Sequence, residues 1–289
     1  MKNDLIHTFS IVGFDPETGE LGVAVASKFL GVGAIVPWAR AGAGAVATQS
    51  WANKEYGQKG LELLEQGKSA EEVIQHLTQA DEGIDLRQVG IVSARGDSAT
   101  FTGRECYQWA GGLSGPHFAC QGNILVDEKT VKVMADTFTT MEGSLAERLL
   151  EALYQGQEAG GDSRGKQSAC LLVVKEGAGY GGTDDQYIDL RVDDHQEPIV
   201  ELKRLFDLHQ LYFNKPNPED MINIEGGVRD RLITNLTILE YLAEDPTMEE
   251  LTEAIQSFHL IENFDERVLE PGLIDKKVIE YMEKLAAQK

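Results

Sequence analysis

The sequence predicts an α+β fold, built as a four-layer αββα sandwich with a helical appendage at its C-terminal end. Segments with strand and helix patterns follow the order strands, two helices, strands, two helices, strands. Helices that come in pairs, rather than one after each strand, argue against a doubly wound parallel sheet and favour antiparallel sheets between helix layers. After residue 213 a linker with two prolines leads into a segment whose pattern is helical throughout.

The first predicted element is a β-hairpin over residues 8–27. Apolar residues alternate along residues 8–13, and residues 21–26 form a small apolar run rich in valine. The stretch DPETGE at 15–20 has turn chemistry, because proline fixes φ and glycine adopts the left-handed conformation. If residues 16–19 form the loop, Asp15 pairs with Glu20, and counting back places Thr8 opposite Ser27.

The remaining elements of this region follow from hydrophobic periodicity and helix-capping signals. Further strands are predicted over residues 42–49, 87–94, 98–102, 168–175 and 187–192. Helices are predicted over residues 56–66, 69–79, 130–141 and 144–155. Capping boxes begin two of these helices, since Glu72 follows Ser69 and Glu147 follows Ser144 at the required spacing.

Three segments make up the predicted domain organisation. Residues 1–213 form the αββα domain, residues 214–218 a linker, and residues 219–289 the helical appendage. Residues 198–213 have the pattern of a single helix that closes the domain. The last 75 residues hold 17 Asp and Glu against 8 Lys and Arg, so the appendage is acidic.

The composition excludes several classes of partner. A formal net charge of −22 argues against nucleic acid, because phosphate binding needs clustered lysine and arginine. The longest apolar stretch, residues 29–47, is broken by Pro37 and Arg40 and is too rich in glycine and alanine to span a bilayer, so no membrane is expected as a partner.

The cysteines and the first residues predict a cytoplasmic protein. Cys106, Cys120 and Cys170 form no CxxC motif, and we expect them to be buried, reduced thiols. The stretch MKNDLIHTF has no apolar core of the kind that a secretory signal contains. No metal and no cofactor are expected, since the acidic turns at 184–185 and 193–195 lack a three-ligand spacing.

Thr8, Ser27 and Lys28 are the candidate residues at the open end of the hairpin. Cross-strand neighbours lie about 4.5–5.5 Å apart, so the predicted pairing brings Thr8 and Ser27 together with Lys28 beside them. An ammonium group activates a hydroxyl without histidine, because lysine lowers the hydroxyl pKa or accepts its proton. We predict Thr8 as the nucleophile, Ser10 as the second choice and Lys28 as the base. The alternative is that all are ordinary strand residues.

Two polar clusters that follow apolar runs are further candidates. Thr48, Gln49 and Asn53 end a strand, where they would orient a substrate amide or else cap the next helix. Gln121 and Asn123 follow a glycine-rich run, and backbone or Asn123 donors there would hold an oxyanion during catalysis. A plain turn is the alternative for this second cluster.

The densest polar cluster is the stretch GGDSRGKQS at 160–168. Its three glycines within six positions indicate backbone conformations that β-branched residues avoid. Arg164 would bind a substrate carboxylate bidentately or would pair with Asp162 in a structural role. Since such loops often carry function, we assign this one to substrate binding. The predicted substrate-binding residues are Ser27, Thr48, Gln49, Asn53, Gln121, Asp162, Arg164, Gln167 and Ser168.

Seven stretches of the sequence together resemble a bacterial and archaeal family, the domain of unknown function 1028. In order they are HTFSIVGFDPETGELGVAVASKFLGVG, VPWARAGAGAVATQSWAN, GLELLEQG, FACQGNIL, RLLEAL, AGGDSRGKQSA and YIDLRVDDH. The resemblance covers residues 7–213. It implies membership of the N-terminal nucleophile (Ntn) hydrolases, whose fold is the αββα sandwich, and hence an amidohydrolase that acts on an amide or peptide bond of a small substrate. The acidic C-terminal segment resembles extensions of some members that are described as wall-binding, although it contains no specific motif for that role.

The sequence departs from the Ntn pattern at its start. Ntn hydrolases use the free α-amine of a leading Thr, Ser or Cys as the base, whereas residues 1–7 precede Thr8 here. Leu5, Ile6 and His7 are predicted to extend the first strand, and the chain is predicted to stay whole. Two functions therefore stay open: the amidohydrolase, with a small molecule or peptide as substrate, and a non-catalytic small-molecule-binding protein without self-processing. The oligomeric state also stays open, with a homo-oligomer as one alternative.

Overall fold

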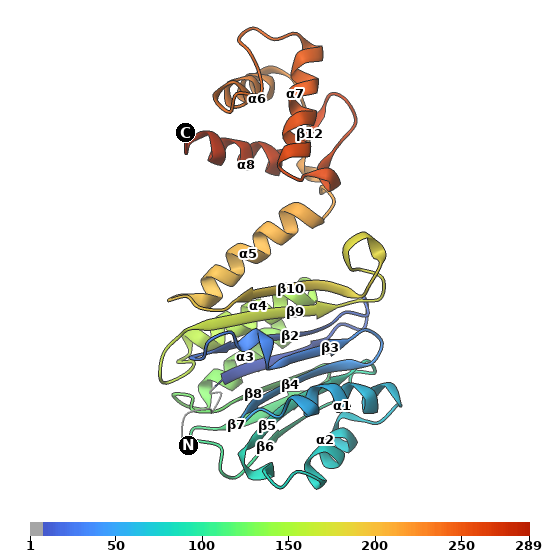
Figure 1. Ribbon diagram of the computed structural model, residues 1–289, viewed down its shortest axis with the longest axis vertical. Coiled ribbons are helices and arrows are strands. Elements are labelled where there is room, and N and C mark those ends of the chain that lie inside the picture. Colours follow the sequence, from blue (N-terminus) through green and yellow to red (C-terminus); the bar gives the residue numbers. More distant parts are fainter. Residues whose placement is uncertain (1–7) are drawn as a thin grey trace. The chain divides into compact units, whose positions relative to one another are not determined.

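The computed structural model describes residues 8–289 of the chain and divides it into two compact units (Figure 1). The N-terminal unit ends at Leu205 and the C-terminal unit covers residues 206–289. The division falls within helix α5 (Pro198–Phe213), whereas the sequence prediction placed it at residues 214–218. The predicted extension of the first strand over residues 5–7 lies outside the described residues.

The N-terminal unit contains two antiparallel β-sheets. The six-stranded sheet has the order β10-β9-β2-β1-β8-β7 and the four-stranded sheet the order β3-β4-β5-β6. The strands of the first sheet are β1 (Thr8–Phe14), β2 (Leu21–Ser27), β7 (Gly111–Gly115), β8 (Phe118–Gly122), β9 (Ser168–Val174) and β10 (Gln186–Val192). Those of the second are β3 (Pro37–Arg40), β4 (Gly44–Ser50), β5 (Arg87–Ser93) and β6 (Ser98–Thr102). The predicted α+β class with antiparallel sheets is confirmed.

A pair of helices covers the outer face of each sheet (Figure 1). Helices α1 (Lys54–Glu65) and α2 (Ala70–Gln79) pack on the four-stranded sheet, and α3 (Lys129–Thr140) and α4 (Leu145–Glu158) pack on the six-stranded one. Buried residues of both sheets, such as Val12, Val23 and Ala47, meet between them in one apolar cluster. The layers thus run helix, sheet, sheet, helix, and the space between the sheets is filled by side chains.

Local sequence signals predicted several of these features correctly. The hairpin pairs Thr8 with Ser27, and the amide of Asp15 donates to the carbonyl of Glu20 at 2.9 Å, as the turn predicted. Both predicted capping boxes are present, at Ser69 and Ser144. Because each of these features depends on residues close in the chain, the sequence alone is sufficient to predict them.

The sequence analysis placed no strand in the glycine-rich region before residue 123. Residues 111–122 instead form a hairpin of β7 and β8, with Gly112 opposite Gln121. Glycine has no side chain, so a glycine-rich segment shows no alternating pattern from which to predict a strand. In this segment tertiary packing determines the strand conformation. A Cβ at position 112 would lie 2.5 Å from Oγ1 of Thr100, so β7 approaches β6 only because residue 112 is glycine.

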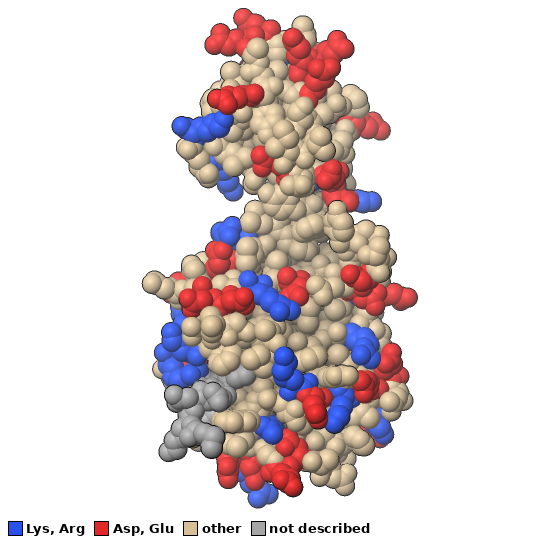
Figure 2. Space-filling model, viewed as in Figure 1, with Lys and Arg blue, Asp and Glu red and all other residues tan. Residues whose placement is uncertain are grey.

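The C-terminal unit packs three helices and a short two-stranded antiparallel sheet around its own core. They are α6 (Gly226–Ile238), α7 (Met248–Ile261), α8 (Lys276–Ala286), β11 (Met221–Asn223) and β12 (Leu273–Asp275). The core contains Leu232, Phe258, Phe264 and Val278, all fully buried. On the face in Figure 2 acidic side chains predominate over this unit. Along residues 8–289 no helix combines the length and apolar character that crossing a membrane requires.

One buried ion pair fixes the centre of the C-terminal unit. The Arg267 side chain is 2% exposed and that of Asp275 is fully buried. The Arg267 guanidinium donates to Oδ2 of Asp275, to the carbonyl of Leu211 and, at 2.8 Å, to the carbonyl of Gln210. The second oxygen of Asp275 accepts the amide of Lys277 and so caps α8. Arg267 therefore links the end of α5 to the start of α8.

Buried His259 makes the stability of this unit depend on pH. Its Nδ1 lies 2.8 Å from the carbonyl of Ile255, and desolvation by burial lowers the pKa of His259 below its ordinary 6.5. The folded state therefore binds this proton less readily than the unfolded state, so the stabilisation is complete above the unfolded pKa and is lost as pH falls. We expect the Tm of the C-terminal unit to fall between about pH 7.5 and about pH 5.5, more steeply in the wild type than in His259→Gln. Calorimetry at a series of pH values measures the Tm. His76→Gln is the control, because His76 is exposed on α2. Equal slopes for wild type and His259→Gln would contradict the assignment.

Candidate functional site

Strand alternation directs the hydroxyl residues of β1 into the space between the two sheets. Val12 belongs to the apolar cluster between the sheets, so Ser10 and Thr8, two and four positions earlier, point the same way. Phe9 points to the opposite face, where it lies near α4. Thr8 and Ser10 are consequently fully buried.

Thr8 is held by hydrogen bonds at both its side chain and its carbonyl. Its Oγ1 donates to Oγ of Ser27, the cross-strand partner on β2, at 3.2 Å. Its carbonyl accepts the backbone amide of Asn123 at 3.0 Å and Nε2 of Gln49 at 3.2 Å. The structure thus brings together four residues that the sequence analysis selected.

A network of buried amide side chains surrounds this position. Ser10 Oγ donates to Oε1 of Gln49 at 2.6 Å and accepts Nε2 of Gln121 at 2.6 Å. Gln49 Nε2 and Asn123 Nδ2 both donate to Oε1 of Gln88, at 2.8 and 2.9 Å. Every member of the network is at most 1% exposed, so its hydrogen bonds lie in the core and join the two sheets.

Gln88 is the central residue that the sequence analysis missed. It joins Gln49 to Asn123, and its Nε2 donates to the carbonyl of Gly122 at 2.8 Å and to Oγ1 of Thr102 at 2.9 Å. In the sequence it is one polar residue in a strand, which is common. Its spacing from Gly90 and Val92 could have indicated its position. The three residues are two positions apart on β5, so they share the face that points between the sheets.

The side chain of Lys28 is directed to a neighbouring loop. Lys28 is exposed, and its Nζ donates to the carbonyl of Lys166 at 3.3 Å. Within the described residues no hydrogen bond joins it to Thr8, whose hydroxyl donates to Ser27 instead. Lys28 follows Ser27, the cross-strand partner of Thr8, but the side chains of Lys28 and Thr8 are hydrogen-bonded to different groups.

The loop at 160–168 is fixed to the end of β2 by Asp162. The Asp162 side chain is 1% exposed. Its Oδ2 accepts the backbone amide of Lys28 at 3.0 Å and Nη2 of Arg164 at 2.8 Å, while Oδ1 accepts the amide of Arg164 at 2.9 Å. The loop's end is held as well, because Oγ of Ser168 accepts the amide of Val32 and donates to the carbonyl of Phe29. Gln167 donates to Oδ1 of Asp194 at 3.0 Å. These contacts are structural, and they leave Arg164 partly exposed.

Thr48 lies on the other face of β4, away from Thr8, and Asn53 follows β4 as the N-cap of α1. Successive strand residues point to opposite faces, so Thr48 faces α1 while Gln49 faces the space between the sheets. Oγ1 of Thr48 donates to the carbonyl of Asn53 at 3.2 Å, and Oδ1 of Asn53 accepts the amide of Glu55 as the cap of α1. Of the two predicted roles for Asn53, the structure places it in the helix cap.

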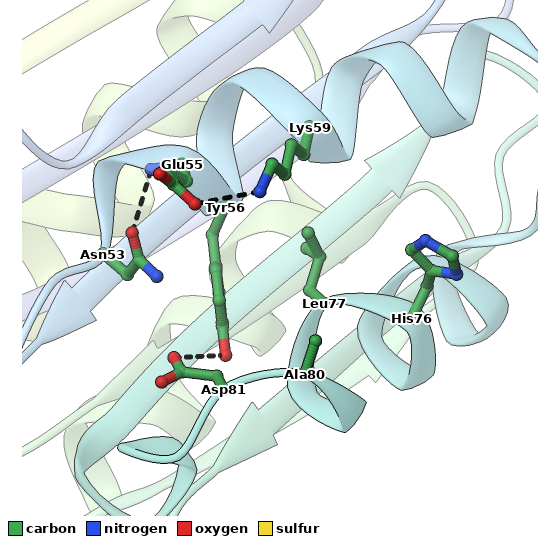
Figure 3. Close-up of a pocket in the computed structure, with 8 residues that line it drawn as sticks. All are labelled: Asn53, Glu55, Tyr56, Lys59, His76, Leu77, Ala80 and Asp81. Carbon is green, nitrogen blue, oxygen red and sulfur yellow. Dashed lines mark hydrogen bonds and ion pairs between the residues drawn. The ribbon is translucent and has the colours of Figure 1, made fainter.

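Asn53 also lines a hollow of about 260 Å³ beside α1 and α2 (Figure 3). In this hollow the hydroxyl of Tyr56 donates to Oδ2 of Asp81 at 2.8 Å, and Nε of Arg87 donates to the same oxygen at 2.7 Å. Burial, and then Asp81, raises the pKa of Tyr56, while the Arg87 guanidinium holds the pKa of Asp81 well below its usual range. These groups satisfy one another and stabilise the loop after α2.

The cysteines are buried, free thiols, as predicted. Burial raises the pKa of Cys170 to about 12 and also raises the pKa values of Cys106 and Cys120. Such thiols are protonated at neutral pH and are poor nucleophiles. Within residues 8–289 no group of three His, Cys, Asp or Glu side chains is arranged to hold a metal ion.

Comparisons with known proteins identify two segments. Residues 8–202 match the model of DUF1028, described as "Family of unknown function", and residues 212–282 match a model described as "Putative peptidoglycan binding domain". The crystal structure of a DUF1028 protein from Silicibacter pomeroyi is similar, with a TM-score of 0.65 and 30% sequence identity. That alignment covers 78% of this chain and 89% of the other. No curated protein matches the chain.

Proposed function

Because the chain belongs to DUF1028, a family of unknown function, we propose from the site geometry that its N-terminal unit is a latent amidohydrolase. The observation that carries the proposal is that Thr8 is fully buried on β1, with its carbonyl held by Asn123 and Gln49. The backbone of an Ntn nucleophile must be held in place, because its reactive amine and its hydroxyl belong to the same residue. The helix–sheet–sheet–helix layering supports the same assignment, an Ntn-hydrolase-like αββα sandwich.

In this proposal, removal of residues 1–7 supplies the missing base. The freed α-amine of Thr8 accepts the proton of Oγ1 as that oxygen bonds to the substrate's carbonyl carbon. The amine then gives the proton to the leaving nitrogen when the C–N bond breaks, and water hydrolyses the resulting ester. Asn123 and Gln49 act as positioning residues in this reaction, since they hold the Thr8 carbonyl. Lys28 and Arg164, both at least partly exposed, would meet the carboxylate of a small amide or peptide substrate.

A chain that begins at Thr8 tests this proposal. We expect such a chain to hydrolyse members of a panel of dipeptides and N-acyl amino acids, and the full chain to be inactive. Thr8→Ser should keep activity, whereas a chain whose first residue is alanine should lose at least about 10³-fold in kcat/KM, because the nucleophile is absent. Liquid chromatography of the released amine provides the measurement.

The intact mass of the full chain is the control for this experiment. We expect the isolated chain to retain residues 1–7 during days of incubation, so that their removal depends on a separate protease. Loss of these residues from the wild type but not from Thr8→Ala would instead indicate self-activation. If the chain beginning at Thr8 is folded and inactive on the whole panel, the amidohydrolase proposal is wrong.

A specific observation favours the second candidate, a non-catalytic small-molecule-binding protein. Thr8 is fully buried, and the ammonium of Lys28 is bound to a loop carbonyl. On this alternative the amide network stabilises the contact between the sheets and the loops around Lys28 and Arg164 bind the ligand. Saturable binding of small amides by a chain that begins at Thr8, without turnover, would support it.

We also propose that the C-terminal unit binds peptidoglycan, on the strength of its match over residues 212–282. We keep the cytoplasm as the proposed location, in which case the ligand is a soluble peptidoglycan fragment or precursor. Fractionation of cells that produce the protein tests the location directly.

A further inference from the structure

A hollow of about 390 Å³ opens on the surface of the C-terminal unit. Four of its residues come from one side of α6 and two from the loop that follows. They are Arg229, Asp230, Ile233, Thr234, Asp245 and Pro246. Residues three or four positions apart lie on the same side of a helix, so the spacing of this set presents several side chains to one space.

The hollow is lined by charged side chains of both signs and by two apolar ones, Ile233 and Pro246. Asp230 and Asp245 are exposed, while Arg229, Ile233 and Pro246 are half-buried. Nη2 of Arg229 donates to the carbonyl of Pro246 at 3.3 Å, which holds the guanidinium against the loop.

The charges of the hollow are not neutralised by one another. In the part of the chain that the structure describes, no ion pair joins Arg229 to Asp230 or Asp245. The two carboxylates, and the part of the Arg229 guanidinium that does not donate to Pro246, are therefore available to a ligand that carries the complementary charges.

We propose that this hollow binds the free end of a peptidoglycan peptide. The terminal carboxylate of the peptide pairs with Arg229, the side-chain amine of its diamino acid pairs with Asp230 and Asp245, and a methyl side chain packs on Ile233 and Pro246. A neutral glycan strand has no charges to match this set, and none of the six lining residues is aromatic. The acidic character of the whole chain, with a net charge of −22, further favours a ligand that bears an amine. The inference rests on the proposed peptidoglycan binding and narrows it to the peptide.

Calorimetric titration of the full chain with a synthetic peptidoglycan tetrapeptide tests the proposal. The peptide contains lysine as its diamino acid and ends in a free D-alanine carboxylate. We expect Arg229→Gln, and separately the pair Asp230→Asn with Asp245→Asn, to weaken binding at least about tenfold, because each removes charge-assisted contacts. Amidating the peptide's carboxylate should weaken binding to the wild type and leave that to Arg229→Gln unchanged. Arg231→Gln is the matched control, since Arg231 is on α6 but pairs with Glu283 at 2.7 Å, outside the hollow.

Sedimentation with insoluble peptidoglycan separates failure of this inference from failure of the broader proposal. If the wild type binds neither insoluble peptidoglycan nor the tetrapeptide, peptidoglycan binding itself is wrong. If the wild type binds peptidoglycan and the hollow variants bind it equally well, the unit binds elsewhere and only the inference about this hollow is overturned. Thermal unfolding of each variant confirms that a lost signal does not come from an unfolded unit.

Discussion

Replacing Arg267 by methionine is expected to destabilise the C-terminal unit by about 3–5 kcal/mol. The substitution removes the guanidinium and leaves the carboxylate of Asp275 fully buried without its cation. It also removes the donors to the carbonyls of Gln210 and Leu211 at the end of α5. Breaking one side of a buried pair costs more than the pair contributes, since the remaining charge has lost both water and partner.

Tryptophan fluorescence reports on the N-terminal unit alone, because Trp38, Trp51 and Trp109 all belong to it. Three of the eight tyrosines, Tyr212, Tyr241 and Tyr281, belong to the C-terminal unit, so a change of the tyrosine signal without a change of that fluorescence is assigned to the C-terminal unit. We expect near-ultraviolet circular dichroism of tyrosine to show the loss in urea while tryptophan fluorescence stays unchanged.

The exposed pair of Arg231 and Glu283 supplies the control for Arg267. Arg231→Met removes an arginine from an ion pair at the surface of the same unit, and it should cost no more than about 1 kcal/mol. If Arg267→Met and Arg231→Met cost the same, the buried pair does not have the structural role assigned to it.

Replacing Gln88 by leucine is expected to cost the N-terminal unit at least about 3 kcal/mol. Leucine has a similar size but no polar atoms, so Nε2 of Gln49 and Nδ2 of Asn123 lose their shared acceptor. The carbonyl of Gly122 loses a donor as well. Each buried group left without a partner costs about 1–3 kcal/mol. Nδ2 of Asn123 loses the acceptor that it has in the structure, and Nε2 of Gln49 keeps only its longer hydrogen bonds to the carbonyls of Thr8 and Gln121.

Thr102→Val is the matched control, because it removes one hydrogen bond to Gln88 and leaves the centre of the network intact. We expect it to cost about 1 kcal/mol, measured for both variants by tryptophan fluorescence in urea. In a chain that begins at Thr8, Gln88→Leu should also lower kcat, since Gln49 and Asn123 hold the Thr8 carbonyl. Equal costs for the two variants would mean that Gln88 is an ordinary strand residue.

The sequence was informative wherever a structural feature depends on neighbours in the chain. The turn at 15–20 has one favoured length, and that length alone sets Thr8 opposite Ser27. The capping boxes at Ser69 and Ser144 are similarly local.

The side-chain partners that the sequence analysis did not predict, and the role of Gln88, depend on tertiary structure. Thr48 and Gln49 are equally polar neighbours, and only the position of the second sheet decides that Gln49 meets Ser10 while Thr48 faces a helix. Gln88 has no partner within ten residues along the chain, so no local pattern indicates its role. Lys28 follows Ser27 directly, yet its Nζ donates to the carbonyl of Lys166. This contact depends on how the loop before β9 folds.

The hydrogen-bonded side chains around Thr8 are amides and hydroxyls, and this has a consequence for the kinetics of a chain that begins at Thr8. Glutamine, asparagine, serine and threonine have no side-chain ionisation in the working range of an enzyme. The proton that governs the reaction is then the one on the Thr8 amine, whose ordinary pKa is about 7.7–8.0. A plot of kcat/KM against pH should therefore rise through one step to a plateau, in contrast to the bell shape that a titrating acid and base produce together.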